Sequence, residues 1–169
     1  MALGIGFVFP GQGSQSVGMG KALYDAHSSL KSVYDEATTV LGYDIAELCF
    51  TGPAERLNLT EFTQPALLVS SVAAWKLFEP VGIKPVVVAG HSLGEYSAMV
   101  AAGGVSFRDA VGLVQKRGRY MSEAVAPGTG LVAALLGLNA EVVKEVCRMA
   151  SSVGVVAAAV FSVACGFGV

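Results

Sequence analysis

Hydrophobic positions along the chain follow two patterns: short continuous runs, and longer stretches in which apolar residues recur every three or four positions. The runs at 4–9, 85–90 and 131–138 adjoin glycine or proline, which is typical of β-strands, and we expect 4–9 to be a buried strand. The longer stretches have the spacing of amphipathic helices. They predict helices over residues 19–41, 45–50, 66–78, 96–102, 107–124 and 140–150.

Two residues mark helix starts: Pro65 suits the first turn of the helix over 66–78, and Ser106 can cap the helix over 107–124. Strands that alternate with helices predict a mostly parallel sheet. The sequence PGTG at 127–130 is a linker, so we expect one subdomain over 1–127 and a smaller one over 128–169. In the first helix we expect a buried face formed by Leu23, Leu30, Val33, Ala37 and Leu41.

Composition narrows the class of protein. Hydrophobic residues make up 53% of the 169 residues and charged residues 14%, which excludes a disordered chain or a coiled coil. The net charge of −2 gives no basic surface, so we expect no nucleic-acid partner. Cys49, Cys147 and Cys165 are odd in number and widely spaced, which indicates free thiols and no metal site. The N-terminus lacks the basic segment of a signal peptide, and we expect a cytoplasmic protein.

The stretch 149–169 contains no charged residue. A C-terminal membrane anchor is one interpretation, but the stretch is barely long enough and lacks leucine and isoleucine, while alanine, glycine and serine insert weakly. We favour a core strand without its neighbours, exposed and prone to aggregation. We therefore expect no membrane partner and poor solubility.

The segment GHSLG at 90–94 follows a predicted strand and precedes a predicted helix, which is the context of a nucleophile elbow. Such a turn is too tight for side chains at positions 90 and 94, and it exposes the Ser92 hydroxyl at a helix N-terminus that favours negative charge. The alternative is a glycine-rich turn in which the serine has no chemical role.

A serine nucleophile needs donors for the oxyanion that forms when it attacks a carbonyl. The backbone N–H of Leu93 is the first expected donor, and the N–H of Gln12, in the loop PGQGSQ at 10–15, is our candidate for the second. Taken alone, that loop could also be a phosphate cradle or a plain turn, although it lacks the lysine of a P-loop.

Arg117 is a charged residue within an apolar stripe of the helix over 107–124. The stripe, at helical spacing, consists of Ala110, Leu113, Val114, Arg117 and Met121. A guanidinium on such a face needs a partner, so a buried ion pair or an extended side chain that reaches solvent are two interpretations. The third is a fork that holds a substrate carboxylate through two hydrogen bonds.

The sequence offers no residue that is suited to act as the general base for Ser92. The sequence contains two histidines, His27 and His91. Successive side chains at a tight turn point apart, so His91 is not suited to serve Ser92, and His27 lies in a polar stretch that we expect at the surface.

Five motifs in order, FVFPGQGSQ, TQPAL, GHSLGEYSA, QKRGRYM and PGTGLVAALLGL, closely resemble the malonyl-CoA:acyl carrier protein transacylase family of bacterial fatty acid synthesis. The same acyltransferase family includes the acyltransferase domains of polyketide synthases. The resemblance covers residues 5 to about 150. It implies an α/β fold with an α/β-hydrolase-like parallel sheet, helices on both of its faces, and a small ferredoxin-like subdomain that is incomplete here.

The resemblance also implies a two-step transfer without a cofactor. Ser92 attacks the malonyl thioester of coenzyme A, and the malonyl group then passes to the phosphopantetheine thiol of acyl carrier protein. Gln12 and Leu93 supply the oxyanion hole in this scheme.

Three further residues receive substrate-binding roles from the resemblance. Arg117 holds the malonate carboxylate, Gln64 of TQPAL lines the site, and His91 supports Arg117. The role of Arg117 agrees with the third interpretation of its place in the stripe.

The departures from the family pattern concern the base. Members of the family carry their catalytic histidine well beyond position 169, and the resemblance weakens after Val156, so we expect a frameshift, a misassembled fragment or a gene remnant. This chain alone should be inactive or weak. The alternatives are a catalytically silent module that binds acyl carrier protein or coenzyme A, and a serine hydrolase of the α/β class.

Overall fold

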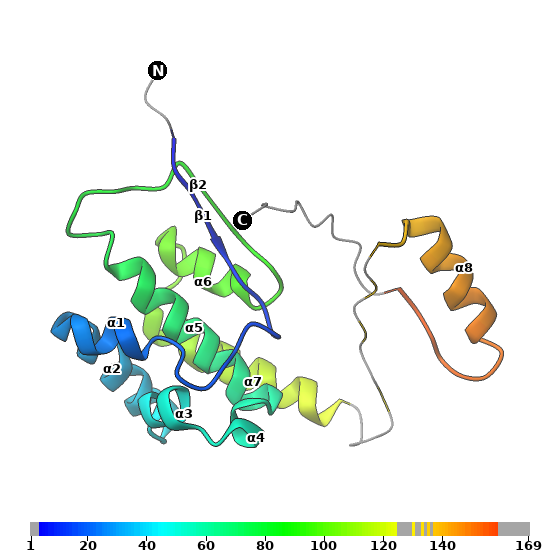
Figure 1. Ribbon diagram of the computed structural model, residues 1–169, viewed down its shortest axis with the longest axis horizontal. Coiled ribbons are helices and arrows are strands. Elements are labelled where there is room, and N and C mark those ends of the chain that lie inside the picture. The colour runs from blue at the N-terminus through cyan, green and yellow to red at the C-terminus, as the bar shows by residue number, and fades with distance from the viewer. Residues whose placement is uncertain (1–3, 125–129, 131–132, 134, 136, 159–169) are drawn as a thin grey trace. The chain divides into compact units, whose positions relative to one another are not determined.

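The computed structural model describes residues 4–124, 130, 133, 135 and 137–158. The chain divides into two compact units, 1–129 and 130–169. The first unit holds most of the described elements (Figure 1), namely β1 (Gly6–Phe9), α1 (Lys21–Ala26), the 3₁₀ turn η1 (Ser28–Leu30), α2 (Lys31–Leu41), α3 (Ile45–Thr51), α4 (Ala54–Leu57), α5 (Thr60–Lys76), β2 (Val87–Gly90), α6 (Gly94–Ala101) and α7 (Phe107–Glu123).

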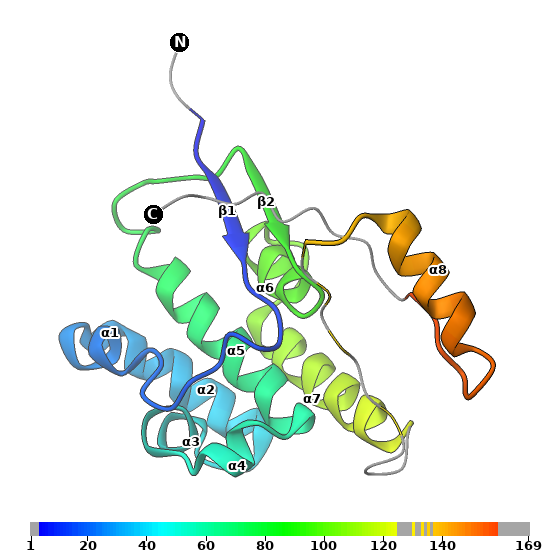
Figure 2. The same ribbon diagram turned by 45° about the vertical axis from the view of Figure 1, so that its right-hand side comes forward.

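The two strands pair in parallel, with Gly6 opposite Val87 and Phe9 opposite Gly90. An α/β fold with a parallel strand pair is therefore present, as the sequence predicts. Both strands end at the same edge of the sheet, which brings the loop after Phe9 beside the turn after Gly90. The sheet lies against α6, as Figure 1 and Figure 2 both show.

The prediction that 4–9 is a buried strand, in a sheet with helices on both faces, is wrong for the described part of the chain. Successive residues of a strand point to opposite faces. The face that carries Phe9 packs inward, whereas on the other face Val8 is 76% exposed and Val87 is 62% exposed. The described elements cover one side of the sheet only.

The single helix predicted over 19–41 is three elements. His27 has extended backbone angles, φ −130° and ψ 99°, so α1 ends there and a 3₁₀ turn leads into α2. His27 is exposed, as expected. The predicted buried face holds at Leu30, Val33, Ala37 and Leu41, but Leu23, on the separate short helix, is exposed.

Helix α5 begins six residues before its predicted start, so Pro65 lies inside the helix and not in its first turn. An internal proline removes one backbone hydrogen bond. Packing offsets this cost, because every residue from Thr63 to Val69 is buried. Helix α5 forms the centre of the first unit, where it contacts α2, α3, α4, α6 and α7.

The helices around α5 follow the sequence closely. Asp44 caps α3 and Ser106 caps α7, each side chain accepting the backbone N–H three residues on. Helix α6 begins at Gly94, two residues earlier than predicted, and the four-residue helix α4 was not predicted. The thiol of Cys49 in α3 is free and buried, as expected, whereas Cys147 is half-buried and Cys165 lies outside the described residues.

The second unit contains α8 (Ala140–Ala150), which matches its prediction and is capped by Asn139. The strand predicted over 131–138 lies partly outside the described residues, and those described within it form no strand. Of the uncharged stretch 149–169, residues 159–169 also lie outside them. No helix in the described part of the chain has both the length and the hydropathy to span a membrane.

Candidate active site

Ser92 lies in the tight turn between β2 and α6. It is the one non-glycine residue of the described chain with a positive φ, 53°. A side chain at Gly90 would overlap the backbone of Gly94, and a side chain at Gly94 would overlap the carbonyl of Phe9. The two glycines therefore let the turn close against β1, and this geometry is that of the predicted nucleophile elbow.

The loop after β1 is held beside this turn by side-chain hydrogen bonds. The Gln12 side chain donates to the Thr60 hydroxyl at 3.1 Å, and the Gln15 side chain accepts from the Gly13 N–H at 2.8 Å and donates to Asn58 at 2.9 Å. The Ser14 hydroxyl donates to the Gly11 carbonyl at 2.8 Å. The end of α4 and the start of α5 thus fix the loop, through Asn58 and Thr60 respectively.

The backbone N–H groups of Gln12 and Leu93 are both available as donors. Within the part of the chain that the structure describes, neither is bonded to an acceptor. They belong to the ends of neighbouring parallel strands, and Leu93 directly follows the serine. Two free donors at this edge are what an oxyanion hole requires.

Arg117 reaches Ser92 from α7. Its Nη2 donates to Ser92 Oγ at 3.1 Å and its Nη1 donates to Gln64 Oε1 at 2.8 Å. The guanidinium carbon lies 5.8 Å from the centre of the Tyr96 ring. Four residues from α5, α6, α7 and the elbow therefore meet at one point.

A buried ion pair does not explain Arg117. Its partners are an amide, a hydroxyl and an aromatic ring, and among the described residues no carboxylate pairs with it. The stripe predicted to face the core is also rotated, since Leu113 is 46% exposed and Met121 is 48% exposed. The buried face of α7 consists of Phe107, Ala110, Val111, Val114 and Gly118.

Gln64 owes its position to the close contact of α5 with α7. A Cβ atom at Gly118 would lie 2.8 Å from both the Cα of Glu61 and the carbonyl oxygen of Thr60, so glycine permits this approach. Gln64 is fully buried, and its amide nitrogen donates to Met121 Sδ at 3.1 Å. Both ends of the amide are thus satisfied, which a buried glutamine requires.

The structure does not bring His91 to Arg117. The imidazole packs against the loop after β1, where a Cβ atom on Gly11 would lie 2.7 Å from His91 Nδ1. Among the described residues, no hydrogen bond joins His91 to Arg117 or Ser92 to a histidine. The support of Arg117 by His91 remains a prediction.

Sequence reasoning from the residues did not identify several contributors to this site. Tyr96, Thr60 and the Gly118 contact are ordinary helix residues by pattern, and Gln64 entered only through the resemblance. One signal was present: a glutamine inside an apolar helix needs a polar partner.

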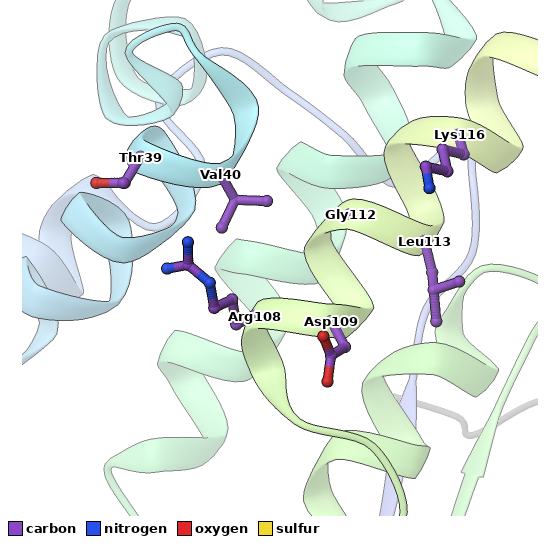
Figure 3. A pocket seen from close by; sticks show the side chains of 7 residues that line it. All are labelled: Thr39, Val40, Arg108, Asp109, Gly112, Leu113 and Lys116. Atoms are coloured by element: carbon purple, nitrogen blue, oxygen red, sulfur yellow. The ribbon is translucent and has the colours of Figure 1, made fainter.

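Two hollows lie along α7, and they differ in chemistry. The larger, about 590 Å³, lies between α2 and α7, and none of its lining residues contacts Ser92. Figure 3 shows the lining, Thr39, Val40, Arg108, Asp109, Gly112, Leu113 and Lys116. The smaller, about 410 Å³, is largely apolar and borders Arg117, Tyr120 and Met121. Arg117, which contacts Ser92, lines the smaller hollow and not the larger.

Acidic and sulfur side chains are not grouped at the site. In the described part of the chain, no three or more His, Cys, Asp or Glu residues lie close enough together to hold a metal ion. The polar groups of this candidate site are the Ser92 hydroxyl, the free N–H groups of Gln12 and Leu93, and the Arg117 guanidinium.

Comparison with known proteins assigns the chain to a family. The model of the acyl transferase domain matches residues 6–165. The chain belongs to the acyl transferase domain family. Malonyl CoA-acyl carrier protein transacylase of Bacillus subtilis strain 168 is 54% identical over 142 residues, which are 84% of this chain and 45% of that protein. The protein of the same name from Escherichia coli K12 is 49% identical, over 86% of this chain and 47% of that one.

Solved structures agree with the sequence comparison. A malonyl CoA-acyl carrier protein transacylase from Coxiella burnetii has a TM-score of 0.84 and 47% identity, over 87% of this chain and 47% of that one. A type II polyketide synthase acyl-carrier protein in complex with its malonyl-transacylase also gives 0.84, with 45% identity, over 88% of this chain and 48% of that one. The chain spans about half the length of the curated relatives it matches.

Proposed function

We propose that this chain provides the nucleophile half of an acyltransferase that moves a malonyl group from coenzyme A to the phosphopantetheine thiol of acyl carrier protein in fatty acid biosynthesis. The contact of Arg117 with both Ser92 and buried Gln64 carries this proposal. It places a fixed positive charge next to the nucleophile, which suits an acyl group that ends in a carboxylate. The names of the relatives support the choice of substrates.

In the first step, Ser92 Oγ attacks the thioester carbonyl carbon, an oxygen–carbon bond forms and the carbon–sulfur bond breaks. The hydroxyl proton is transferred to the departing sulfur, so coenzyme A leaves as a thiol and malonyl remains as a serine ester. The N–H groups of Gln12 and Leu93 hold the transient oxyanion. In the second step, the carrier protein's thiol attacks the ester, and Ser92 recovers its proton.

Both steps need a general base, and the described part of the chain does not supply one to Ser92. No histidine is bonded to Ser92 in the described part of the chain. The resemblance assigns the family's histidine to a region that this chain does not match. Removing a base from such a site leaves the oxyanion hole and binding contributions, so we propose slow turnover or none for this chain alone.

The finer fold assignments belong to the same proposal. We propose that residues 1–127 are part of an α/β-hydrolase-like subdomain and that 128–169 begin a ferredoxin-like one. No cofactor enters the proposed reaction, because both steps are acyl transfers between a hydroxyl and a thiol. The cytoplasmic location stays a prediction.

Two alternatives to acyl transfer are a silent binding module and a serine hydrolase. A silent module would bind malonyl-CoA or carrier protein without forming an ester. A serine hydrolase for neutral esters gains nothing from a guanidinium beside its nucleophile, so Arg117 argues against the hydrolase hypothesis.

Intact-mass measurement of the purified chain after incubation with malonyl-CoA tests the proposal. We expect a slowly forming malonyl adduct on the wild-type chain and none on Ser92→Ala, since the adduct requires the nucleophile. Folded wild-type protein that binds malonyl-CoA but forms no adduct would support the silent module instead. An acetyl adduct from acetyl-CoA that forms as fast as the malonyl adduct would contradict the role of Arg117.

A further inference from the structure

We propose that Arg117 also blocks Ser92 in the free protein, and that a carboxylate releases the serine by taking the guanidinium. This inference rests on the proposed function, because it concerns an acyl group that bears a carboxylate. It adds a second level of selection: the correct acyl group would both bind the site and free its nucleophile.

The first step of the argument is how Arg117 is held. Nη1 is bonded to Gln64, which is fully buried and whose amide nitrogen is already engaged by Met121 Sδ. Gln64 therefore cannot turn to exchange its oxygen for its nitrogen without losing both contacts. The guanidinium is anchored at one end and rests near the Tyr96 ring, so its free end is directed to Ser92.

The second step concerns the hydroxyl. Arg117 Nη2 donates to Ser92 Oγ at 3.1 Å, and within the described residues this is the one hydrogen bond of that oxygen. The bond occupies one of the two lone pairs of the oxygen and draws electron density away from it. A serine held in this way is a poorer nucleophile than one with both lone pairs available.

The third step is the competition between acceptors. A carboxylate accepts from a guanidinium more strongly than a neutral hydroxyl does, and it can take two N–H groups at once. No carboxylate of the described chain pairs with Arg117, so at Nη2 an incoming carboxylate competes with the neutral Ser92 hydroxyl, while Gln64 keeps Nη1. A neutral acyl chain brings no such acceptor and leaves the serine blocked.

The test measures the reactivity of Ser92 toward a small neutral electrophile, a dialkyl fluorophosphate. Ser92 Oγ forms a bond to phosphorus, the phosphorus–fluorine bond breaks, and the serine proton leaves with fluoride as hydrogen fluoride. Intact-mass spectra taken over time give the labelling rate, with Ser92→Ala as the blank. Acetate supplies the carboxylate without filling the oxyanion hole, while acetamide and chloride at equal concentration supply the neutral and ionic controls.

We expect acetate to raise the labelling rate of the wild-type chain by about three- to tenfold, the factor for one hydrogen bond of ordinary net strength, and acetamide and chloride to leave it unchanged. Arg117→Met should label faster than wild type without acetate and should not respond to it. Arg119→Met, which removes an exposed arginine of the same helix outside the site, should behave as wild type.

The proposal is overturned if acetate slows labelling or leaves its rate unchanged, or if Arg117→Met labels no faster than wild type, including the case in which neither is labelled. The acetate arm on wild-type protein needs no variant to fold. Failure of the proposed function is a separate result, because it appears as a missing malonyl adduct while acetate still accelerates labelling.

Discussion

Ser92 holds a backbone conformation that costs a residue with a side chain about 1–2 kcal/mol. Its φ of 53° is maintained by the turn that Gly90 and Gly94 allow, where β2, α6 and the end of β1 meet. In this conformation the hydroxyl accepts the hydrogen bond from Arg117. At the scale of a single residue, the strained position is also the one that we propose as the nucleophile.

A second set of polar residues lies inside the core and takes no part in the proposed chemistry. The Ser70 hydroxyl lies 3.5 Å from the Tyr34 hydroxyl, and it donates to Cys49 Sγ at 3.9 Å. Burial raises the pKa of Cys49 from 9.0 to about 12 and that of Tyr34 from 10.0 to about 12. Both groups are therefore neutral in the folded protein well into the alkaline range.

This shift predicts a loss of stability at high pH. Above pH 9 the unfolded chain releases the Cys49 proton while the folded chain retains it, so the free energy of unfolding falls, by roughly 1 kcal/mol per pH unit for each such group. Above pH 10, ionisation of Tyr34 in the unfolded chain lowers the free energy of unfolding further. Denaturant unfolding at pH 7 to 11 should show a plateau below pH 9 and a decline above it.

The matched variants are Cys49→Ala and Cys147→Ala. Cys49→Ala should be less stable at pH 7, but its free energy of unfolding should fall less steeply just above pH 9. Cys147→Ala should show the same pH dependence as the wild-type chain. A free energy of unfolding that is constant through pH 10.5 would contradict the expectation.

At the scale of elements, the contact between α5 and α7 positions the site. Substitution of two glycines of α7, Gly118 and Gly112, tests how close this contact is. A Cβ atom at Gly118 would lie 2.8 Å from the backbone of α5, so Gly118→Ala should force the helices apart and destabilise the fold by about 1–3 kcal/mol. At Gly112 the nearest atom would be Val40 Cγ1 at 3.9 Å. Gly112→Ala should therefore stabilise the fold by up to about 1 kcal/mol, since alanine favours helix.

Denaturant midpoints of the two variants give the comparison. Opposite signs are the expected outcome, and a similar small effect at both positions would mean that the helices do not meet at Gly118. The Gly118 variant should also form less malonyl adduct, because Gln64 and Arg117 would separate.

The elements also show which features the sequence could predict. The elbow follows from local geometry, since strand, glycines and serine are adjacent in the sequence, and the caps at Asp44 and Ser106 are equally local. The orientation of α7 and the start of α5 were not predictable in this way. They depend on how α5 packs against its neighbours. Of the apolar residues in the predicted stripe of α7, Ala110 and Val114 are buried, whereas Leu113 and Met121 are exposed.

At the scale of the molecule, one face of the strand pair lacks a cover among the described elements. It presents Val8 and Val87, and both strands have an unpaired edge in the described sheet. Exposed apolar strands associate with one another. We therefore expect this chain to self-associate as its concentration rises.

Substitution of the face tests this expectation. Val8→Lys combined with Val87→Thr should shift the chain toward monomer in sedimentation velocity experiments, because a charge on an exposed strand opposes pairing. Val81→Thr is the control, since Val81 is 67% exposed but lies outside the sheet. Equal association of the control and the double variant would show that another surface is responsible.

The parallel pairing of β1 with β2 joins segments about 80 residues apart in the sequence. Closing so long a loop costs chain entropy that is recovered only when the strands are in register, and distant pairings of this kind are slow to form. Helical turns between them depend on neighbours in the chain and can form earlier. The loop that carries Gln12 and the turn that carries Ser92 and Leu93 come together only at that late event, so the proposed site is complete only when folding is, and a chain with full helix content can still lack it.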